Sequence, residues 1–248
     1  MPSHQTSTAF TDPATRRLTL TAGVLFILTF ITSIGALALY GPVLDDPGYV
    51  LGGGADTRVM LGALLEIFLV AANIGTALAL FPLLKRQSEG LALGYVAARV
   101  VESTIIAFGV ISLLGVVTLR QDPASADTSS LLASAQALVA VHDWTFLLGP
   151  GFVVPFGNGL ILGYLMYKSG IVPRRMAMLG LVGGPLLFVS STLALFGVHE
   201  QVSGTALLMT VPEIAWEASL GIYLTVKSVR AGRTAAGARA LSPAAAAA

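Results

Sequence analysis

The sequence predicts an all-α, polytopic membrane bundle of six transmembrane helices with both termini in the cytoplasm. Of the 248 residues, 55% are hydrophobic and only 11% are charged, whereas a soluble domain carries about 25% charged residues. The mean hydropathy is strongly positive, at +0.82. Six apolar stretches are each long enough to cross a hydrocarbon layer about 30 Å thick, which takes roughly 20 helical residues.

The six predicted spans follow one another along most of the chain. They are Leu18–Tyr40, Val59–Phe81, Leu91–Leu119, Thr145–Tyr167, Met176–Phe196 and Thr205–Val226. Their continuous hydrophobicity favours helices over barrel strands, in which polar and apolar residues would alternate over shorter runs. We expect residues 1–15 to form a disordered N-terminal tail, 16–230 the six-span domain, and 231–248 a disordered, alanine-rich tail.

Lysine and arginine determine the predicted orientation. Basic residues precede the first span, follow the second, separate the fourth from the fifth and follow the sixth: Arg16, Arg17, Lys85, Arg86, Lys168, Arg174, Arg175, Lys227, Arg230, Arg233 and Arg239. The opposite loops hold only Arg58 and Arg120. The positive-inside rule therefore places both termini in the cytoplasm. The pair Arg16-Arg17 also resembles a twin-arginine export signal, but the apolar run that follows is too long for a secretory signal.

Two segments on the outer side have distinct patterns. The first, residues 41–57, contains the run Gly52-Gly53-Gly54 without a following lysine, which indicates a flexible outer loop or lid and excludes a phosphate loop. The second precedes span four, where apolar residues recur at helical spacing: Leu131, Leu132, Ala135, Leu138 and Val139. This spacing predicts a short amphipathic helix that lies at the outer interface and runs into span four.

Proline is confined to the later spans, as Pro150, Pro155, Pro185 and Pro212. Each removes a backbone donor and tends to bend its helix. Glycine pairs at four-residue spacing, Gly159/Gly163 and Gly180/Gly184, would let spans four and five approach closely. Two interpretations stay open: a bent, tightly packed half of the bundle, or bends that open a cavity.

Charged residues inside the spans are the strongest functional signal. Glu66, Arg99, Glu102, Glu213 and Glu217 lie in apolar stretches, where each charge costs about 2.5–3.5 kcal/mol on insertion scales. Arg99 and Glu102 are three residues apart, and Glu213 and Glu217 are four apart, so each pair shares one helix face. We therefore expect spans two, three and six to meet around a polar core that also includes Asn73. One arginine neutralises one or two of four glutamates. The remaining carboxylates must be protonated, hydrated or balanced by a cation; the alternative is a salt-bridge network that only fixes helix register.

The triplet His142-Asp143-Trp144 stands at the start of span four. Asp143 is suited to cap a helix and Trp144 to sit in the interfacial aromatic belt. A mixed cation site of His142, Asp143 and Glu66 is the functional alternative. The other histidines, His4 and His199, are remote in sequence, so we expect no zinc site and no cofactor. Because the chain has no cysteine, disulfides and thiolate metal sites are excluded.

Several stretches resemble the bacterial membrane-protein family termed domain of unknown function 4386. They are Gly41–Pro47, Leu61–Glu66, Glu89–Tyr95 through Arg99–Glu102, His142–Gly151 and, more loosely, Pro212–Glu217. The resemblance covers nearly the whole chain after residue 15. It implies a multi-span protein of the bacterial plasma (inner) membrane, and implies that Glu66, Arg99, Glu102, His142, Asp143 and Trp144 occupy positions typical of that family. It supplies no activity.

Three functional hypotheses follow from the polar core. The first is a small transporter, channel-like protein or sensor with a proton- or cation-linked pocket. The second is an intramembrane enzyme acting on a lipid or isoprenoid, for which a nucleophile pattern is missing, and the third is a non-catalytic membrane subunit. We expect membrane lipids as partners, with a proton, cation or small molecule as ligand. No basic domain outside the membrane could bind nucleic acid, and the sequence leaves a homo-oligomer open.

Overall fold

The computed structural model describes residues 10–123 and 127–241, and these ranges contain helices and no strand. The elements are α2 (Pro13–Leu44), the short 3-10 helix η1 (Tyr49–Leu51), α3 (Asp56–Leu84), α4 (Glu89–Gln121), α5 (Thr128–Phe146), the π-helices η2 (Leu147–Val153) and η3 (Pro155–Leu162), α6 (Gly163–Ser169), α7 (Arg174–Leu195) and α8 (Gly204–Leu241). α5, η2, η3 and α6 form one long helix of 42 residues. The predicted all-helical class is confirmed.

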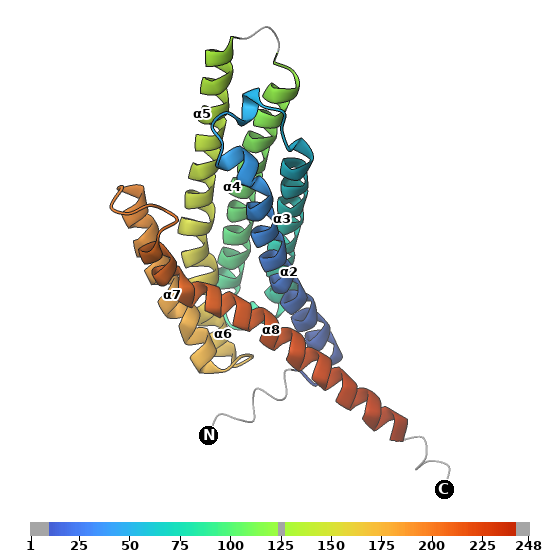
Figure 1. The fold of residues 1–248 in the computed structure, drawn as a ribbon. Coiled ribbons are helices and arrows are strands. Elements are labelled where there is room, and N and C mark those ends of the chain that lie inside the picture. The colour runs from blue at the N-terminus through green and yellow to red at the C-terminus, as the bar shows by residue number, and fades with distance from the viewer. Residues whose placement is uncertain (1–9, 124–126, 242–248) are drawn as a thin grey trace.

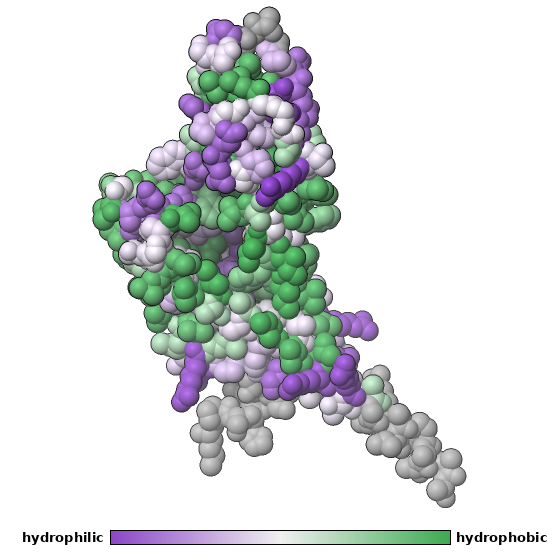
Figure 2. All heavy atoms as spheres, viewed as in Figure 1, coloured by the Kyte–Doolittle hydropathy of each residue, from purple (hydrophilic) through white to green (hydrophobic). Residues whose placement is uncertain are grey.

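Five helices in the described part of the chain are long and apolar enough to cross a membrane: α2, α3, α4, the long helix Thr128–Ser169 and α7. They correspond to the first five predicted spans. α8, which contains Pro212, Glu213 and Glu217, is not among the five. A broad hydrophobic band separates hydrophilic residues at the two ends of the molecule, as a protein embedded in a bilayer requires (Figure 2).

The helices pack as a bundle, and α7 and α8 form a hairpin across one side of it (Figure 1). α2 packs against α3 and α8, α4 lies between α3 and α5, and α7 pairs with α8 and with η3. The start of α2 and the end of α8 lie at the same end of the molecule (Figure 1). Two hydrophobic clusters fill the bundle. One includes Leu84, Leu165 and Trp216, and the other includes Tyr40 and Leu113. The polar side chains of interest lie between them.

Glycine permits the closest helix crossings. A Cβ atom on Gly184 of α7 would lie 2.7 Å from the carbonyl oxygen of Pro155 and 3.0 Å from the Cα of Gly159. The backbones of α7 and η3 are therefore in direct contact, which confirms that these glycines let spans four and five approach. A second crossing joins α2 to α8, where a Cβ on Gly23 would lie 2.9 Å from the carbonyl oxygen of Gly221.

The outer segments differ from the sequence prediction. α5 is the first part of the 42-residue helix, so the predicted helix does run into span four, but it stands alongside α4 (Figure 1) and is not a separate short helix. The reason is packing: Leu131 and Ala135 are buried in the cluster that contains Tyr49 and Val116. Burial there removes more apolar surface from water than a position at the lipid boundary would.

The loop predicted as a flexible lid is largely held in place. Arg120 at the end of α4 donates through Nε to the carbonyl oxygen of Gly52 (3.1 Å) and pairs through Nη1 with Asp56 (2.5 Å). Tyr49 of η1 donates its hydroxyl to the same carboxylate at 2.7 Å. Burial raises the pKa of the Tyr49 phenol well above its usual range, and its bond to Asp56 acts in the same direction.

The predicted tails are partly helical. α2 begins at Pro13, where Asp12 caps the helix by accepting a hydrogen bond from the Thr15 amide at 2.8 Å. α8 continues to Leu241, so the first part of the 231–248 segment belongs to this helix. Residues 1–9 and 242–248 of the two predicted tails lie outside the described residues.

The contact between α7 and η3 generates a test of packing. Gly184→Ala should destabilise the protein by about 1–3 kcal/mol, the usual cost of overpacking, because its methyl group would collide with backbone atoms. Gly90→Ala is the matched control, since a Cβ there meets nothing within 4 Å. Thermal unfolding in detergent measures both. Equal melting temperatures for Gly184→Ala and the native protein would contradict the direct backbone contact.

Candidate functional site

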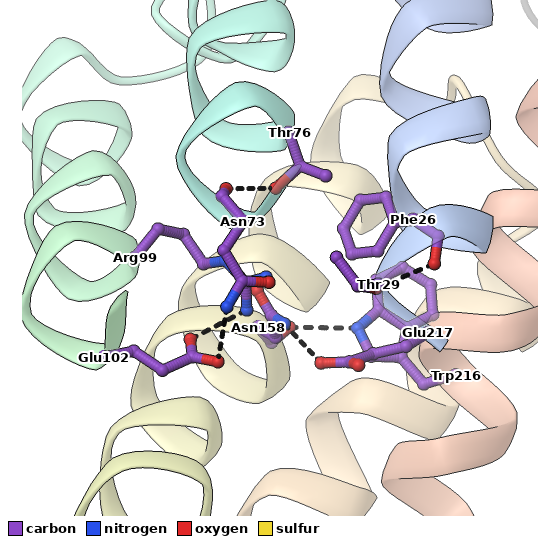
Figure 3. Close-up of polar contacts among 9 residues, drawn as sticks. All are labelled: Phe26, Thr29, Asn73, Thr76, Arg99, Glu102, Asn158, Trp216 and Glu217. Carbon is purple, nitrogen blue, oxygen red and sulfur yellow. Dashed lines mark hydrogen bonds and ion pairs between the residues drawn. The ribbon is translucent and has the colours of Figure 1, made fainter. Parts of the chain in front are cut away.

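The centre of the bundle holds a buried triad of polar side chains from α3 and α4. Arg99 donates through Nη1 to Glu102 at 2.8 Å and through Nη2 to the Asn73 side-chain oxygen. Asn73 in turn donates to the second oxygen of Glu102 at 3.2 Å. All three are at most 5% exposed. The three-residue spacing in α4 puts Arg99 and Glu102 on one helix face, directed at α3 (Figure 3).

A second set of polar groups faces this triad from η3 and α8. Asn158 donates its side-chain amide to a carboxylate oxygen of Glu217. Trp216 of α8 donates its indole N–H to the backbone oxygen of Asn158 at 2.9 Å. Asn158 lies between the Arg99 side and the Glu217 side (Figure 3), and Arg99 interacts electrostatically with Glu217. Four elements therefore meet at one polar centre.

The π-helical conformation of η2 and η3 explains how Asn158 reaches this centre. Pro150 and Pro155 provide no backbone N–H, and a proline ring clashes with the carbonyl one turn earlier in an ordinary α-helix. Widening the helix relieves that clash, and such π segments occur often at functional sites. The wider turn is visible in the hydrogen bonding, because the amide of Gly163 donates to the carbonyl of Asn158, five residues earlier.

Glu213 is the most unusual side chain in the region. It is 2% exposed, and neither carboxylate oxygen has a hydrogen-bond partner among the described residues. It lies against glycines of two other helices: a Cβ on Gly183 would be 2.8 Å, and one on Gly159 3.1 Å, from its Oε2 atom. Its carboxylate is within electrostatic range of Glu217 and Arg99.

A separate polar contact lies nearer the α4–α5 end of the bundle. Tyr40 of α2 donates its hydroxyl to Glu66 of α3 at 2.8 Å, and its ring rests over Gly62. The same ring meets the imidazole of His142 edge to face, with centroids 5.7 Å apart. His142 is buried, with 6% exposed, whereas its neighbour Asp143 has a side chain 65% exposed.

Comparison with known families gives one match. The profile of the family described as "Domain of unknown function (DUF4386)" matches residues 21–228. The chain belongs to the DUF4386 family. No curated protein and no solved structure matches it. The resemblance noted in the sequence is therefore shown, and it covers all six long helices.

In this DUF4386 protein the predicted site residues fall into two groups. Asn73, Arg99, Glu102 and Glu217 converge at the polar centre, with Glu213 one helical turn away on α8. Glu66 and His142 are linked through Tyr40 instead, and Asp143 is directed toward the surface. Within the described ranges no three His, Asp or Glu side chains are arranged to hold a metal ion, so the mixed site of Glu66, His142 and Asp143 is not assembled.

Three residues of the DUF4386 site were missed in the sequence. Asn158, Trp216 and Tyr40 were not predicted as site residues: aromatic rings are common in apolar spans, and Asn158 is not spaced with a charged residue on its own span. A signal for Asn158 was present: it is an amide between Pro155 and Gly159, within a span whose backbone cannot form a regular helix. Tyr40 and Trp216 had no such signal, since their contacts depend on long-range packing.

The triad of Asn73, Arg99 and Glu102 generates a test by double-mutant cycle. Arg99→Met should cost about 3–5 kcal/mol, because it leaves the Glu102 carboxylate buried without its partner. Adding Glu102→Leu should recover a large part of that loss, since no buried charge then remains unpaired. Unfolding in detergent measures the four corners of the cycle, with the exposed Arg86→Met as control. Additive effects would show that the two side chains do not interact.

Proposed function

We propose that the chain is a small transporter, channel-like protein or sensor of the bacterial plasma membrane, with a proton- or cation-linked polar pocket inside its bundle. One observation carries this proposal: in the interior of the described bundle, the carboxylates, buried in Glu102 and Glu213 and half-buried in Glu66 and Glu217, outnumber the one buried arginine, Arg99. Arg99 is paired with Glu102, whereas Glu66, Glu213 and Glu217 have no ion-pair partner in the described part of the chain. The charges of these three carboxylates must be neutralised by protons, hydrated by water or balanced by a bound cation.

The positions of these carboxylates support a path rather than a single buried pair. Glu66 stands seven residues before Asn73 on α3, which is roughly 10 Å along the helix axis at 1.5 Å per residue. It is only half-buried, as is Glu217. Figure 2 also shows hydrophilic surface recessed between hydrophobic side chains in the middle of the visible face. Intramembrane acids at successive depths are typical of proton relays and ion transporters.

We further propose that α8 is the sixth span and that both termini are cytoplasmic. α8 is 38 residues long and pairs with α7. One side of α8 exposes large apolar side chains, among them Leu207, Leu208, Ile214 and Ile222, while the other side buries Glu213, Trp216, Leu220 and Leu224 against other helices. This distribution suits a helix with one lipid-facing side and one side packed in the bundle, where the glutamates stand beside apolar residues. The clusters of lysine and arginine at the helix ends support this orientation.

Ion movement can be measured in liposomes that contain the purified protein and a trapped pH-sensitive dye. An imposed pH or cation gradient should produce a protein-dependent proton flux. Glu217→Gln should abolish most of it, because an amide cannot bind and release a proton. Glu200→Gln, at an exposed loop position, should leave the flux unchanged. Vesicles without any protein-dependent response to protons or cations would remove the proposal.

The topology can be tested separately because the natural chain has no cysteine. Val202→Cys lies between α7 and α8 and is highly exposed, and Thr234→Cys lies near the end of α8 and is exposed. A membrane-impermeant maleimide added to intact spheroplasts should label the first and spare the second until the cells are permeabilised. Labelling of both from one side would show that α8 does not cross.

A further inference from the structure

The junction of η3, α7 and α8 gathers oxygen acceptors that lack donors. Both oxygens of Glu213 and the side-chain oxygen of Asn158 make no hydrogen bond within the described residues. Asn158 is 0% exposed and Glu213 is 2% exposed. Buried polar atoms almost always have a partner, so each such exception calls for an explanation. Here the exceptions share one chemical character, since all three are oxygens that accept.

The surroundings of these oxygens are narrow. The Glu213 carboxylate lies against the backbones of Gly159 and Gly183, with no side chain of either residue intervening. Asn158 precedes Gly159 on η3 and binds Glu217, which stands one turn after Glu213 on α8. Because only glycine backbone adjoins the Glu213 carboxylate here, a ligand bound beside it must be small.

The nearest positive side chain is Arg99, whose Nε makes no hydrogen bond within the described residues. Arg99 uses its two terminal nitrogens for Glu102 and Asn73. It acts on Glu213 and Glu217 through space but makes no direct contact with either in the ion-pair geometry. A charge that balances Glu213 at close range must therefore come from outside the protein.

We propose that Glu213, Asn158 and Glu217 bind a small monovalent cation of the sodium type. This inference rests on the function proposed above and specifies its ligand. A proton can join only two oxygens, whereas a hard cation takes several oxygen ligands at once. Divalent ions fit less well, because calcium takes 6–8 oxygens and magnesium retains several waters. Segments of π-helix occur often at functional sites, and η3, which begins at Pro155, carries Asn158.

Trp216 provides a direct readout. Its indole donates to the backbone oxygen of Asn158, so an ion held by the Asn158 side chain should change the emission of Trp216. The chain has two tryptophans, and Trp144→Phe leaves Trp216 as the only one. In detergent, sodium chloride should replace choline chloride at constant ionic strength while emission is recorded. We expect a saturable change with sodium, at least a tenfold weaker response to potassium, and none with choline.

Two variants test the assignment of the ligands. In the Trp144→Phe background, Glu213→Gln should abolish the sodium response, whereas Glu200→Gln, at an exposed loop position, should retain it. Should Glu213→Gln fail to fold, Glu213→Asp serves instead and should weaken sodium binding at least tenfold in equilibrium dialysis with radioactive sodium. A response that persists unchanged in these Glu213 variants would place the ion elsewhere and overturn the proposal.

The failure of this inference can be distinguished from the failure of the proposed function. Emission that responds to pH but not to sodium at any pH would show a protonated site, and the sodium assignment would be wrong. Proton flux into liposomes prepared in sodium-free choline buffer would then still support a proton-linked protein. Flux that is absent under every condition, together with saturable sodium binding, would retain the site and remove the transport function.

Discussion

The buried ion pair between Arg99 and Glu102 is the constraint around which the bundle is organised. Neither charge can face lipid, and neither can be left alone in a medium of low dielectric constant, so the helices must arrange partners for both. Asn73 completes the arrangement by accepting from the guanidinium and donating to the carboxylate. α3 and α4 are thereby fixed in register at mid-depth, with hydrophobic packing on both sides of the triad.

The second half of the centre depends on irregular backbone. Pro150 and Pro155 make η2 and η3 wider than an α-helix, and Gly159 lets α7 come into backbone contact. These features bring Asn158 to Glu217 and Glu213 close to η3. A regular helix with larger residues would hold α7 and α8 farther away and leave the two glutamates without polar neighbours. The prolines thus explain the irregular backbone of η2 and η3, and the consequence is that Asn158 lies beside the glutamates of α8.

Much of this could be predicted from the sequence, because the signals were local. Hydrophobic runs set the helices, and the spacing of Arg99 from Glu102 set their common face. The glycine pairs at 159/163 and 180/184 indicated the contact between spans four and five. The remaining features depend on tertiary packing. Nothing near Leu131 shows that α5 would pack along α4, and nothing near Tyr40 shows that its hydroxyl would meet Glu66. Asn158 was the one residue whose local sequence carried a signal that was not used.

The seam between α7 and η3 has a mechanical consequence. At Gly159 and Gly184 the two backbones touch directly, and the rings of Phe156 and Phe188 pack edge to face across the same pair of helices. Asn158 lies on one side of this seam and Glu213 and Glu217 lie on the other. Sliding or pivoting of the α7–α8 hairpin along it would change the distance between the oxygens that these residues present. If the proposed ion binds there, its occupancy and the position of the hairpin would be thermodynamically linked, because an ion that stabilises one arrangement of the oxygens also selects one arrangement of the helices.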